Sequence, residues 1–260
     1  MNLTKNTILI TGGGSGIGRG LAEAFHALGN QVIISGRSSK SLDETTAANP
    51  GIKSLKLDVS KPESIESFVA QLTRDFPRLN VLINNAGMMT PENLLDPSAN
   101  SDEAEATITT NLLGPIRLTA ALLPLLQKQG RAAIMNVSSG LAFLPLAMAP
   151  TYNATKAAIH SYTESLRYQL KDTKVEVLEL IPPYVQTTLG GEAQASDPNA
   201  MPLRDFIDEV MQILKEQPDA TEICVQKVLP LRRAAEGGQK KYDQFFTQFN
   251  DTMTAALSAH

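Results

Sequence analysis

The stretch TILITGGGSGIG, Thr7–Gly18, decides the fold of this chain. It begins with a short β-branched run that is typical of a buried strand, and its glycines lead into a helical pattern from Gly16 to Leu28. Glycine permits a tight turn and close approach of the backbone, and the unpaired N–H groups at a helix start suit a pyrophosphate. The literal G-x-G-x-x-G fingerprint is absent, because the spacing of Gly12, Gly16 and Gly18 predicts a longer turn. A flexible glycine-rich loop is the alternative, and the flanking strand and helix argue against it.

Similar short β-branched runs alternate with helical patterns as far as residue 180. This alternation is the signature of βαβ units and a parallel sheet. The predicted strands are 7–11, 31–35, 54–57, 81–84, 132–137 and 175–180. The predicted helices are 16–28, 39–47, 62–76, 101–127 (broken near Pro115) and 150–170. We therefore expect an α/β fold: a Rossmann-like, doubly wound parallel sheet with helices on both faces.

The pattern changes after residue 180. Residues 182–202 are rich in Pro, Gly, Ala and Ser without a clear period, and long connections of this kind often cover substrates. Together with an amphipathic helix at 203–217, they predict a substrate lid at about 182–217. In the atypical segment 218–260, Asp219 is expected to cap a helix through Ile223, Val228 and Leu231, and 242–249 to form a last short helix. We expect residues 1–260 to form a single domain.

The composition narrows the classes of function. The chain has 260 residues, 42% hydrophobic and 19% charged, and its net charge of -4 offers no basic footprint for nucleic acid. A single cysteine, Cys224, rules out an intramolecular disulfide and a multi-cysteine metal site, which fits a reducing compartment. No apolar run approaches the roughly 20 residues that span a bilayer, so we expect a cytoplasmic protein. Because the three histidines show no ligand spacing, we expect no metal and interpret them as structural or solvated.

A tyrosine and a lysine stand four residues apart in Tyr152-Asn153-Ala154-Thr155-Lys156. On a helix this spacing places both side chains on one face. An ammonium near a phenol stabilises the phenolate and lowers a pKa that is otherwise about 10, which prepares the phenol for proton transfer at neutral pH. The spacing alone is weak evidence, since Tyr and Lys also fall four apart as ordinary surface residues.

Four motifs in order carry a family resemblance. They are T-G-x-x-x-G-x-G at Thr11–Gly18, N-N-A-G at Asn84–Gly87, a serine after the fifth strand, and Y-x-x-x-K at Tyr152–Lys156. Together they resemble the short-chain dehydrogenase/reductase family, in its single-domain branch, over roughly Leu3–Leu189. With its C-terminal segment, the chain also looks like the oxidoreductases associated with bacterial D-alanylation genes.

The resemblance implies a catalytic group. The family serine lies thirteen positions before the tyrosine, which identifies Ser139, with Ser138 as the fallback. In the family, the phenol of Tyr152 would move a proton at the substrate oxygen, the serine would hydrogen-bond that oxygen, and Lys156 would bind the nicotinamide ribose. The helix asparagine that holds a relay water maps onto Asn111. The alternatives are turn chemistry for the serine, a bond to a kinked helix for Asn111 and interfacial packing for Tyr152.

The resemblance also implies the cofactor contacts. They would come from the glycine turn, the residues after the third and fourth strands, the catalytic pair and the segment after Pro182. These residues are Gly12, Ser15, Gly16, Ile17, Gly18, Asp58, Val59, Asn84, Ala86, Gly87, Tyr152, Lys156, Val185 and Thr187. Turn chemistry is the alternative for the asparagines. Pro183 departs from the family, which usually has glycine there, and this puts the local loop path in doubt.

The residues at the end of the second strand indicate whether the cofactor is NADP(H) or NAD(H). NAD-preferring relatives carry an acidic residue there that binds the ribose diol. This chain has Gly36 at that position, followed by Arg37, whose guanidinium suits a 2′-phosphate, and Ser38 as a further contact. We therefore expect NADP(H), with NAD(H) as the alternative. Arg37 could instead be a solvated loop residue or stack on adenine.

The expected substrate is a ketone, aldehyde or secondary alcohol with an apolar body. The pocket candidates are largely apolar and include no arginine for a carboxylate. They are Ser139, Leu141, Phe143, Met148 and Tyr184, with Met88, Leu144 and Leu189 as further candidates. Core packing is the alternative for each apolar member.

We therefore expect an NADP(H)-dependent carbonyl reductase or alcohol dehydrogenase acting on a small molecule. A nicotinamide-binding sensor without turnover is the alternative from another class. An epimerase or dehydratase of the longer, extended relatives is a third hypothesis, and the glycine spacing counts against it. Since the usual C-terminal Asp-Gly-Gly stretch is missing, a dimer through helices 101–127 and 150–170 is favoured over the family's tetramer.

Overall fold

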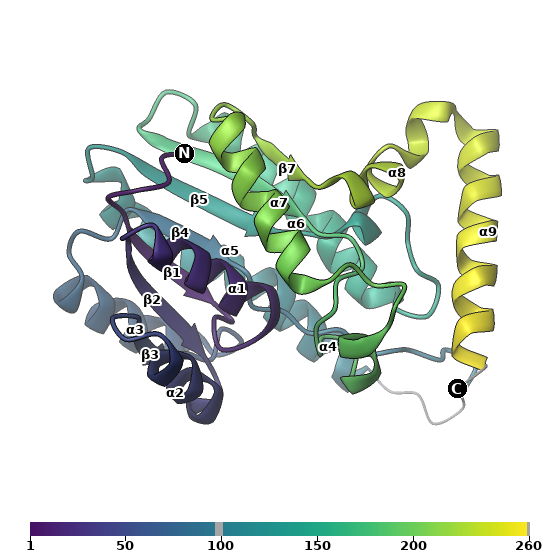
Figure 1. Ribbon diagram of the computed structural model, residues 1–260, viewed down its shortest axis with the longest axis horizontal. Coiled ribbons are helices and arrows are strands. Elements are labelled where there is room, and N and C mark those ends of the chain that lie inside the picture. Colours follow the sequence, from purple (N-terminus) through teal and green to yellow (C-terminus); the bar gives the residue numbers. More distant parts are fainter. Residues whose placement is uncertain (97–100, 259–260) are drawn as a thin grey trace.

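The computed structural model of the protein describes residues 1–96 and 101–258. In this part of the chain a parallel sheet has the strand order β3-β2-β1-β4-β5-β6-β7 (Figure 1). The strands are β1 (Thr7–Thr11), β2 (Gln31–Gly36), β3 (Lys53–Lys56), β4 (Val81–Asn84), β5 (Ala132–Val137), β6 (Val175–Ile181) and β7 (Glu222–Cys224). The order reverses between β1 and β4, and in such folds ligands bind beside that point, at the carboxyl ends of the strands. The predicted doubly wound fold is confirmed.

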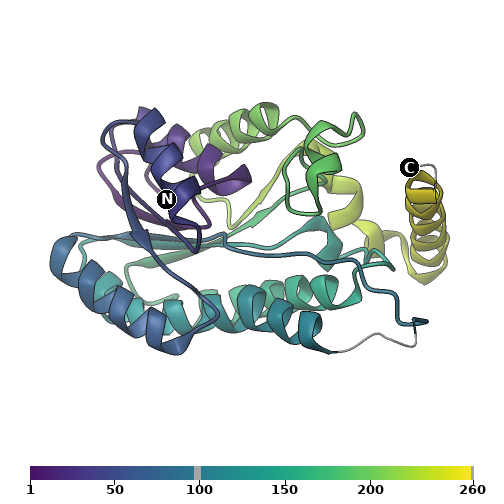
Figure 2. The ribbon, with the colours of Figure 1, turned by 90° about the horizontal axis from the view of Figure 1, so that it is seen from below.

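Helices cover both faces of the sheet. Figure 2 shows α1, α2 and α7 on one face and α3, α5 and α6 on the other. The helices are α1 (Gly16–Ala27), α2 (Ser39–Ala48), α3 (Pro62–Asp75), α4 (Asp102–Ile108), α5 (Gly114–Gln127), α6 (Pro150–Gln169), α7 (Leu203–Glu216), α8 (Leu229–Arg232) and α9 (Gln239–Ser258). Because side chains alternate along a strand, Ile8 and Ile10 of β1 pack into the core with α1 and α7, whereas Leu9 packs into the opposite core.

The predicted break near Pro115 is a π-helical turn, Thr109–Leu113, between α4 and α5. The whole stretch Asp102–Gln127 is long and apolar enough to cross a membrane by length and composition. Its leucines at 118, 122 and 126 are fully buried in the core shared with α3. Packing against the sheet therefore accounts for the apolar character of this helix.

The C-terminal segment differs from its prediction. The expected helix from Asp219 through Ile223 is wrong, because Glu222–Cys224 forms β7 and pairs in parallel with β6. Three residues are too few to show a strand period; they are extended because they pair with β6, which places Ile223 in the core. The last helix is also longer than the predicted 242–249. It stands apart from the layers (Figures 1 and 2), and Asn250 connects it to the backbone of Pro145 and Ala147.

Candidate active site

The glycine turn after β1 has the backbone that its sequence predicts. Gly12 and Gly16 have φ of +66° and +51°, a region that L side chains rarely adopt. The turn is fastened to the one after β4, because the Thr11 hydroxyl accepts hydrogen bonds from the N–H groups of Asn85 and Ala86, each at 3.0 Å. Two strand ends are thus held together beside the start of α1.

A cavity of about 350 Å³ opens at this point. It brings together predicted site residues from five separate stretches of chain. The predicted residues that line it are Gly12, Ser15, Gly16, Ile17, Ala86, Gly87, Met88, Ser138, Ser139, Tyr152, Lys156, Val185, Thr187 and Leu189. The narrow glycine turn, the open start of α1 and the polar group at the other end fit a dinucleotide. Sequence reasoning missed Asn85, Met89, Thr90, Thr188 and Gln194, which also line the cavity.

Tyr152 and Ser139 meet inside the cavity. The tyrosine lies in the first turn of α6 and is only 5% exposed, while Ser139 follows β5 and accepts a hydrogen bond from the N–H of Leu141 at 3.1 Å. Burial raises the pKa of Tyr152 to about 12, and the hydrogen bond from Ser139 acts against that rise. The phenol therefore carries its proton at neutral pH.

Lys156 lies one turn further along α6, with its ammonium 5.5 Å from the centre of the Tyr152 ring. It donates to the carbonyl of Val137 at 2.9 Å. Burial lowers the pKa of Lys156 to about 8, and the charge of Glu179 acts in the opposite direction. The predicted lowering of the Tyr152 pKa is not seen, because loss of water around the phenol is the larger effect.

Asn111 sits in the π-helical turn and is 2% exposed. Its side-chain oxygen accepts from the N–H of Met88 and its amide nitrogen donates to the carbonyl of Met88, both at 2.8 Å. The amide also donates to the Thr155 hydroxyl at 3.2 Å. Asn111 therefore ties the turn after β4 to α6. This bond to a neighbouring loop differs from the bond to its own kinked helix that was the alternative.

Several predicted cofactor residues lie outside the lining of this cavity. Asn84 is buried in the sheet, where its amide donates to Thr119 and Asn136, and Asn85 takes its place at the cavity wall. Gly18 packs against the carbonyl of Gly12 within the turn. The others lie beyond the ends of β2 and β3: Arg37, Ser38, Asp58 and Val59.

The group beyond β2 and β3 is partly prearranged. Arg37 is exposed, and the Ser38 hydroxyl accepts the N–H of Ser41 at the start of α2. Burial acts to raise the pKa of the Asp58 carboxyl, but hydrogen bonds from Ser60 and the charge of Arg37 hold it below its usual value. Arg37 and Asp58 thus lie near each other, beyond the ends of neighbouring strands.

The predicted substrate residues divide into two groups. Met88 and Leu189 line the cavity, whereas Leu141, Phe143, Met148 and Tyr184 do not, and Leu144 is fully buried. Phe143 packs edge-on against His160 and beneath the guanidinium of Arg232. The Tyr184 hydroxyl donates to Asp197 at 3.0 Å. These internal contacts hold Phe143 and Tyr184 outside the cavity lining.

The connection after β6 is organised by Gln194. This side chain is 8% exposed, donates to the carbonyl of Val185 at 2.8 Å and to the Thr187 hydroxyl at 3.1 Å, and accepts the N–H of Gly190. The segment also pairs across itself, Val185 with Met201. Sequence reasoning had no signal for Gln194, because its partners all lie in a segment without a period.

The fold and the cavity define an α/β protein of the dinucleotide-binding class, and comparisons with known proteins identify its family. The family model for the short chain dehydrogenases matches residues 6–198. The uncharacterized oxidoreductase DltE of Bacillus subtilis is 40% identical over 96% of this chain and 98% of its own. The chain belongs to the short-chain dehydrogenase family and is an NAD(P)-dependent oxidoreductase similar to DltE.

Solved structures of relatives were obtained with either nicotinamide. A short-chain dehydrogenase from Sphingobium yanoikuyae in complex with NADPH is 27% identical, with a TM-score of 0.77 over 89% of this chain and 92% of its own. A 3-ketoacyl-(acyl-carrier-protein) reductase from Brucella melitensis complexed with NADH is 26% identical, with a TM-score of 0.73 over 88% and 94%. Use of NADP(H), with NAD(H) as the alternative, is consistent with these relatives.

Proposed function

We propose that this protein is an NADP(H)-dependent reductase of a ketone or aldehyde with an apolar body, or the dehydrogenase of the corresponding alcohol. The observation that carries the proposal is the meeting of Ser139, Tyr152 and Lys156 in the same cavity as the glycine turn. Met88, Met89 and Leu189 support an apolar substrate, because they supply apolar wall to that cavity.

Each catalytic side chain has one task in this proposal. Tyr152, protonated at neutral pH because burial raises its pKa to about 12, donates its proton to the substrate oxygen as that oxygen gains negative charge. Ser139 hydrogen-bonds the same oxygen, and Lys156 binds the nicotinamide ribose. Asn111 holds the turn of Met88 against α6 and keeps the cavity wall in place. Bound there, the nicotinamide supplies or accepts the hydride.

The cofactor would lie along the carboxyl ends of the strands. Gly12, Gly16 and Ile17 would hold its phosphates at the start of α1, and Val185 and Thr187 its carboxamide end. Arg37 is exposed at the end of β2 and would bind the 2′-phosphate. We expect turnover with NADP(H) to exceed turnover with NAD(H) at matched concentrations, and Arg37→Ala to remove the difference. Equal or better use of NAD(H) by the wild type would contradict this choice.

The activity test is a screen of carbonyls and alcohols that follows NADPH absorbance. Tyr152→Phe keeps the ring and removes the proton donor, and we expect turnover to fall by roughly 10²- to 10⁴-fold. Full turnover in a folded Tyr152→Phe variant would refute the role of the phenol. If a broad panel gives no turnover while NADPH binds tightly, the alternative of a nicotinamide sensor is favoured.

The remaining parts of the proposal concern the surroundings of the site. Residues 182–217 are proposed as the substrate lid of a single domain formed by 1–260, because Val185, Thr187 and Gln194 close one side of the cavity. A cytoplasmic homodimer is proposed through the helices at 101–127 and 150–170. An apolar groove between them, lined by Ile108, Leu112 and Ala158, supports this surface. Size-exclusion chromatography with light scattering tests it, and a monomeric mass would contradict it.

A further inference from the structure

Two charged side chains of opposite sign are buried near the catalytic group. Among the Lys, Arg, Asp and Glu side chains that the structure describes, only Lys156 and Glu179 are buried, at 5% and 0% exposure. A charge without water is unfavourable unless an opposite charge and hydrogen bonds replace the water. The proposed roles so far use Lys156 and leave Glu179 unexplained.

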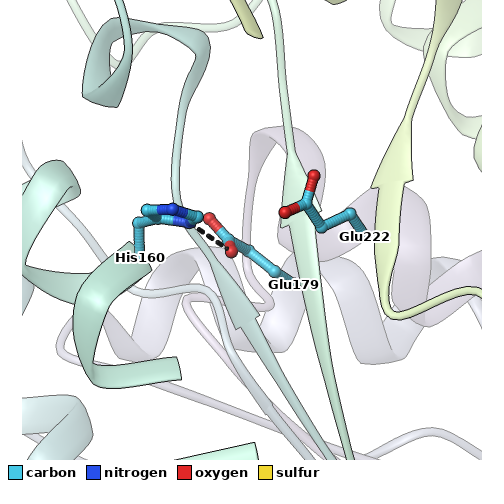
Figure 3. A group of neighbouring side chains, drawn as sticks. All are labelled: His160, Glu179 and Glu222. Carbon is cyan, nitrogen blue, oxygen red and sulfur yellow. Dashed lines mark hydrogen bonds and ion pairs between the residues drawn. The ribbon is translucent and has the colours of Figure 1, made fainter. Parts of the chain in front are cut away.

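Glu179 is held in place by partners on both of its oxygens. One oxygen accepts the Ser138 hydroxyl, and the other lies 2.8 Å from Nδ1 of His160 (Figure 3). An ionised carboxylate only accepts, so Nδ1 of His160 carries the proton in that state. Glu179 thus has a hydrogen-bond partner on each of its carboxylate oxygens.

The backbone brings Glu179 and Lys156 to the same place. Lys156 and His160 are four residues apart on α6 and therefore share a face of the helix. Lys156 bonds the carbonyl of Val137, and Glu179 bonds the hydroxyl of the next residue, Ser138. The two charges are thus attached to neighbouring residues at the end of β5, Lys156 on the cavity side.

We propose that Glu179 is the buried counter-charge that keeps Lys156 protonated at neutral pH, which makes it a positioning residue for the reaction. The expected effect of Glu179 on turnover rests on the proposed function, whereas the pairing of the two charges does not depend on it. In support, burial lowers the pKa of Lys156 to about 8 and the Glu179 carboxylate acts against that fall. Loss of Glu179 would lower the pKa of Lys156 further and so reduce the fraction of charged lysine at the pH where it has to bind the ribose and assist the phenol.

Other charged groups near Glu179 have partners of their own. Glu222 of β7 is held by Arg232 of α8, with contacts of 2.7 and 2.8 Å, and Arg167 of α6 adds positive charge beside it. Glu164 lies 3.8 Å from Nε2 of His160. Cys224 lies nearby, and the pKa of its thiol is raised by burial and by Glu222.

The group His160, Glu179 and Glu222 has donor atoms within 4.8 Å of one another, a spacing that could hold a divalent metal (Figure 3). Each carboxylate already has hydrogen-bond partners, and a metal would have to displace Arg232 from Glu222. The arrangement therefore favours a charge network over a metal centre.

The first test measures NADPH affinity as a function of pH, because Lys156 loses its ammonium as pH rises. We expect affinity to fall at alkaline pH in the wild type, and Glu179→Gln to move the midpoint down by about 1 pH unit, the low end of the effect of an adjacent opposite charge. Glu222→Gln removes a charge from the same cluster and is the matched control, with an unchanged midpoint. An unchanged midpoint in Glu179→Gln, or a wild-type midpoint that EDTA moves, would overturn the proposal.

The second test needs neither cofactor nor turnover, so it separates this proposal from the proposed function. Unfolding is compared for the wild type, Glu179→Gln, Lys156→Met and the double variant. We expect the double variant to lose less stability than the sum of the two single losses, because neither charge is left alone. If Glu179→Gln alone does not fold but the double variant does, the outcome also supports the pairing. Additive losses, or a double variant that does not fold, would overturn the pairing.

Discussion

Gly18→Ala tests how closely the glycine turn must approach α1. A Cβ at this position would lie 2.3 Å from the carbonyl oxygen of Gly12 and 2.4 Å from the side-chain nitrogen of Asn85. Carbon and oxygen atoms in weak contact are separated by about 3.3 Å, so the turn and the helix start would have to part by roughly 1 Å. We expect a loss of about 1–3 kcal/mol in the free energy of unfolding, because the opposing atom is backbone and cannot rotate away.

The same displacement should act on cofactor binding. Since the start of α1 and the turn line one cavity, we expect the dissociation constant for NADPH to rise about 10- to 100-fold. Gly29→Ala is the control for backbone strain alone. At φ of +79° an alanine is strained by about 1–2 kcal/mol, but its Cβ would have no neighbour within 4 Å and Gly29 lies outside the cavity lining, so NADPH affinity should be unchanged. Urea unfolding and NADPH titration give both quantities. Wild-type NADPH affinity in a folded Gly18→Ala variant would refute the reasoning.

Three further predictions concern the charge of Lys156, the lid and the core. The pKa of Lys156 is about 8 in the folded chain and about 10.5 in the unfolded chain, so the unfolded chain binds more protons between these pH values. The free energy of unfolding of the wild type should therefore rise across this range by on the order of 3 kcal/mol relative to Lys156→Met. Urea unfolding of both proteins at pH 7 and pH 10 measures this change, and a difference that does not vary with pH would contradict it. Tyr184→Phe removes the hydrogen bond to Asp197, worth about 1 kcal/mol, and should speed limited proteolysis within residues 182–202, with cleavage elsewhere unchanged. An unaltered cleavage rate in this segment would mean that the hydrogen bond does not hold it in place. Phe206→Ala leaves a cavity at a fully buried position in the core of α1 and α7, and it should lower the free energy of unfolding, measured by urea denaturation, by about 3–5 kcal/mol. A loss below about 1 kcal/mol would mean that this core is not closely packed.

Local patterns were sufficient for most of the fold. The six strands from β1 to β6 are short, mostly apolar runs that alternate with longer helical patterns, and each lies within a residue or two of its predicted bounds. β7 could not be predicted, because its three residues owe their extended form to pairing with β6. The helix expected from Asp219 through Ile223 was wrong for the same reason, whereas the last predicted helix, 242–249, lies within α9.

The two asparagines at the end of β4, Asn84 and Asn85, show the same limit of sequence patterns at the site. The motif N-N-A-G marked the turn after β4, but not which asparagine faces the cavity. Alternation along the last residues of β4 sends Asn84 into the sheet toward Thr119, and Asn85 to the turn of Gly12. His160 is a second case: its sequence neighbours gave no sign of function, and only the packing of α6 on β6 brings it to Glu179.

The sequence by itself determined the family and the order of the motifs, and it marked Ser139, Tyr152 and Lys156 as the candidate catalytic group, because each motif is a local pattern with fixed spacing. The tertiary structure decided which of the marked residues share a cavity, that Gln194 holds one wall of it, and that burial raises the pKa of Tyr152. It also placed Glu179 behind Lys156, 23 positions later in the sequence. Burial and charge pairing arise from atoms that meet only when the strands are assembled, so no local pattern carries them.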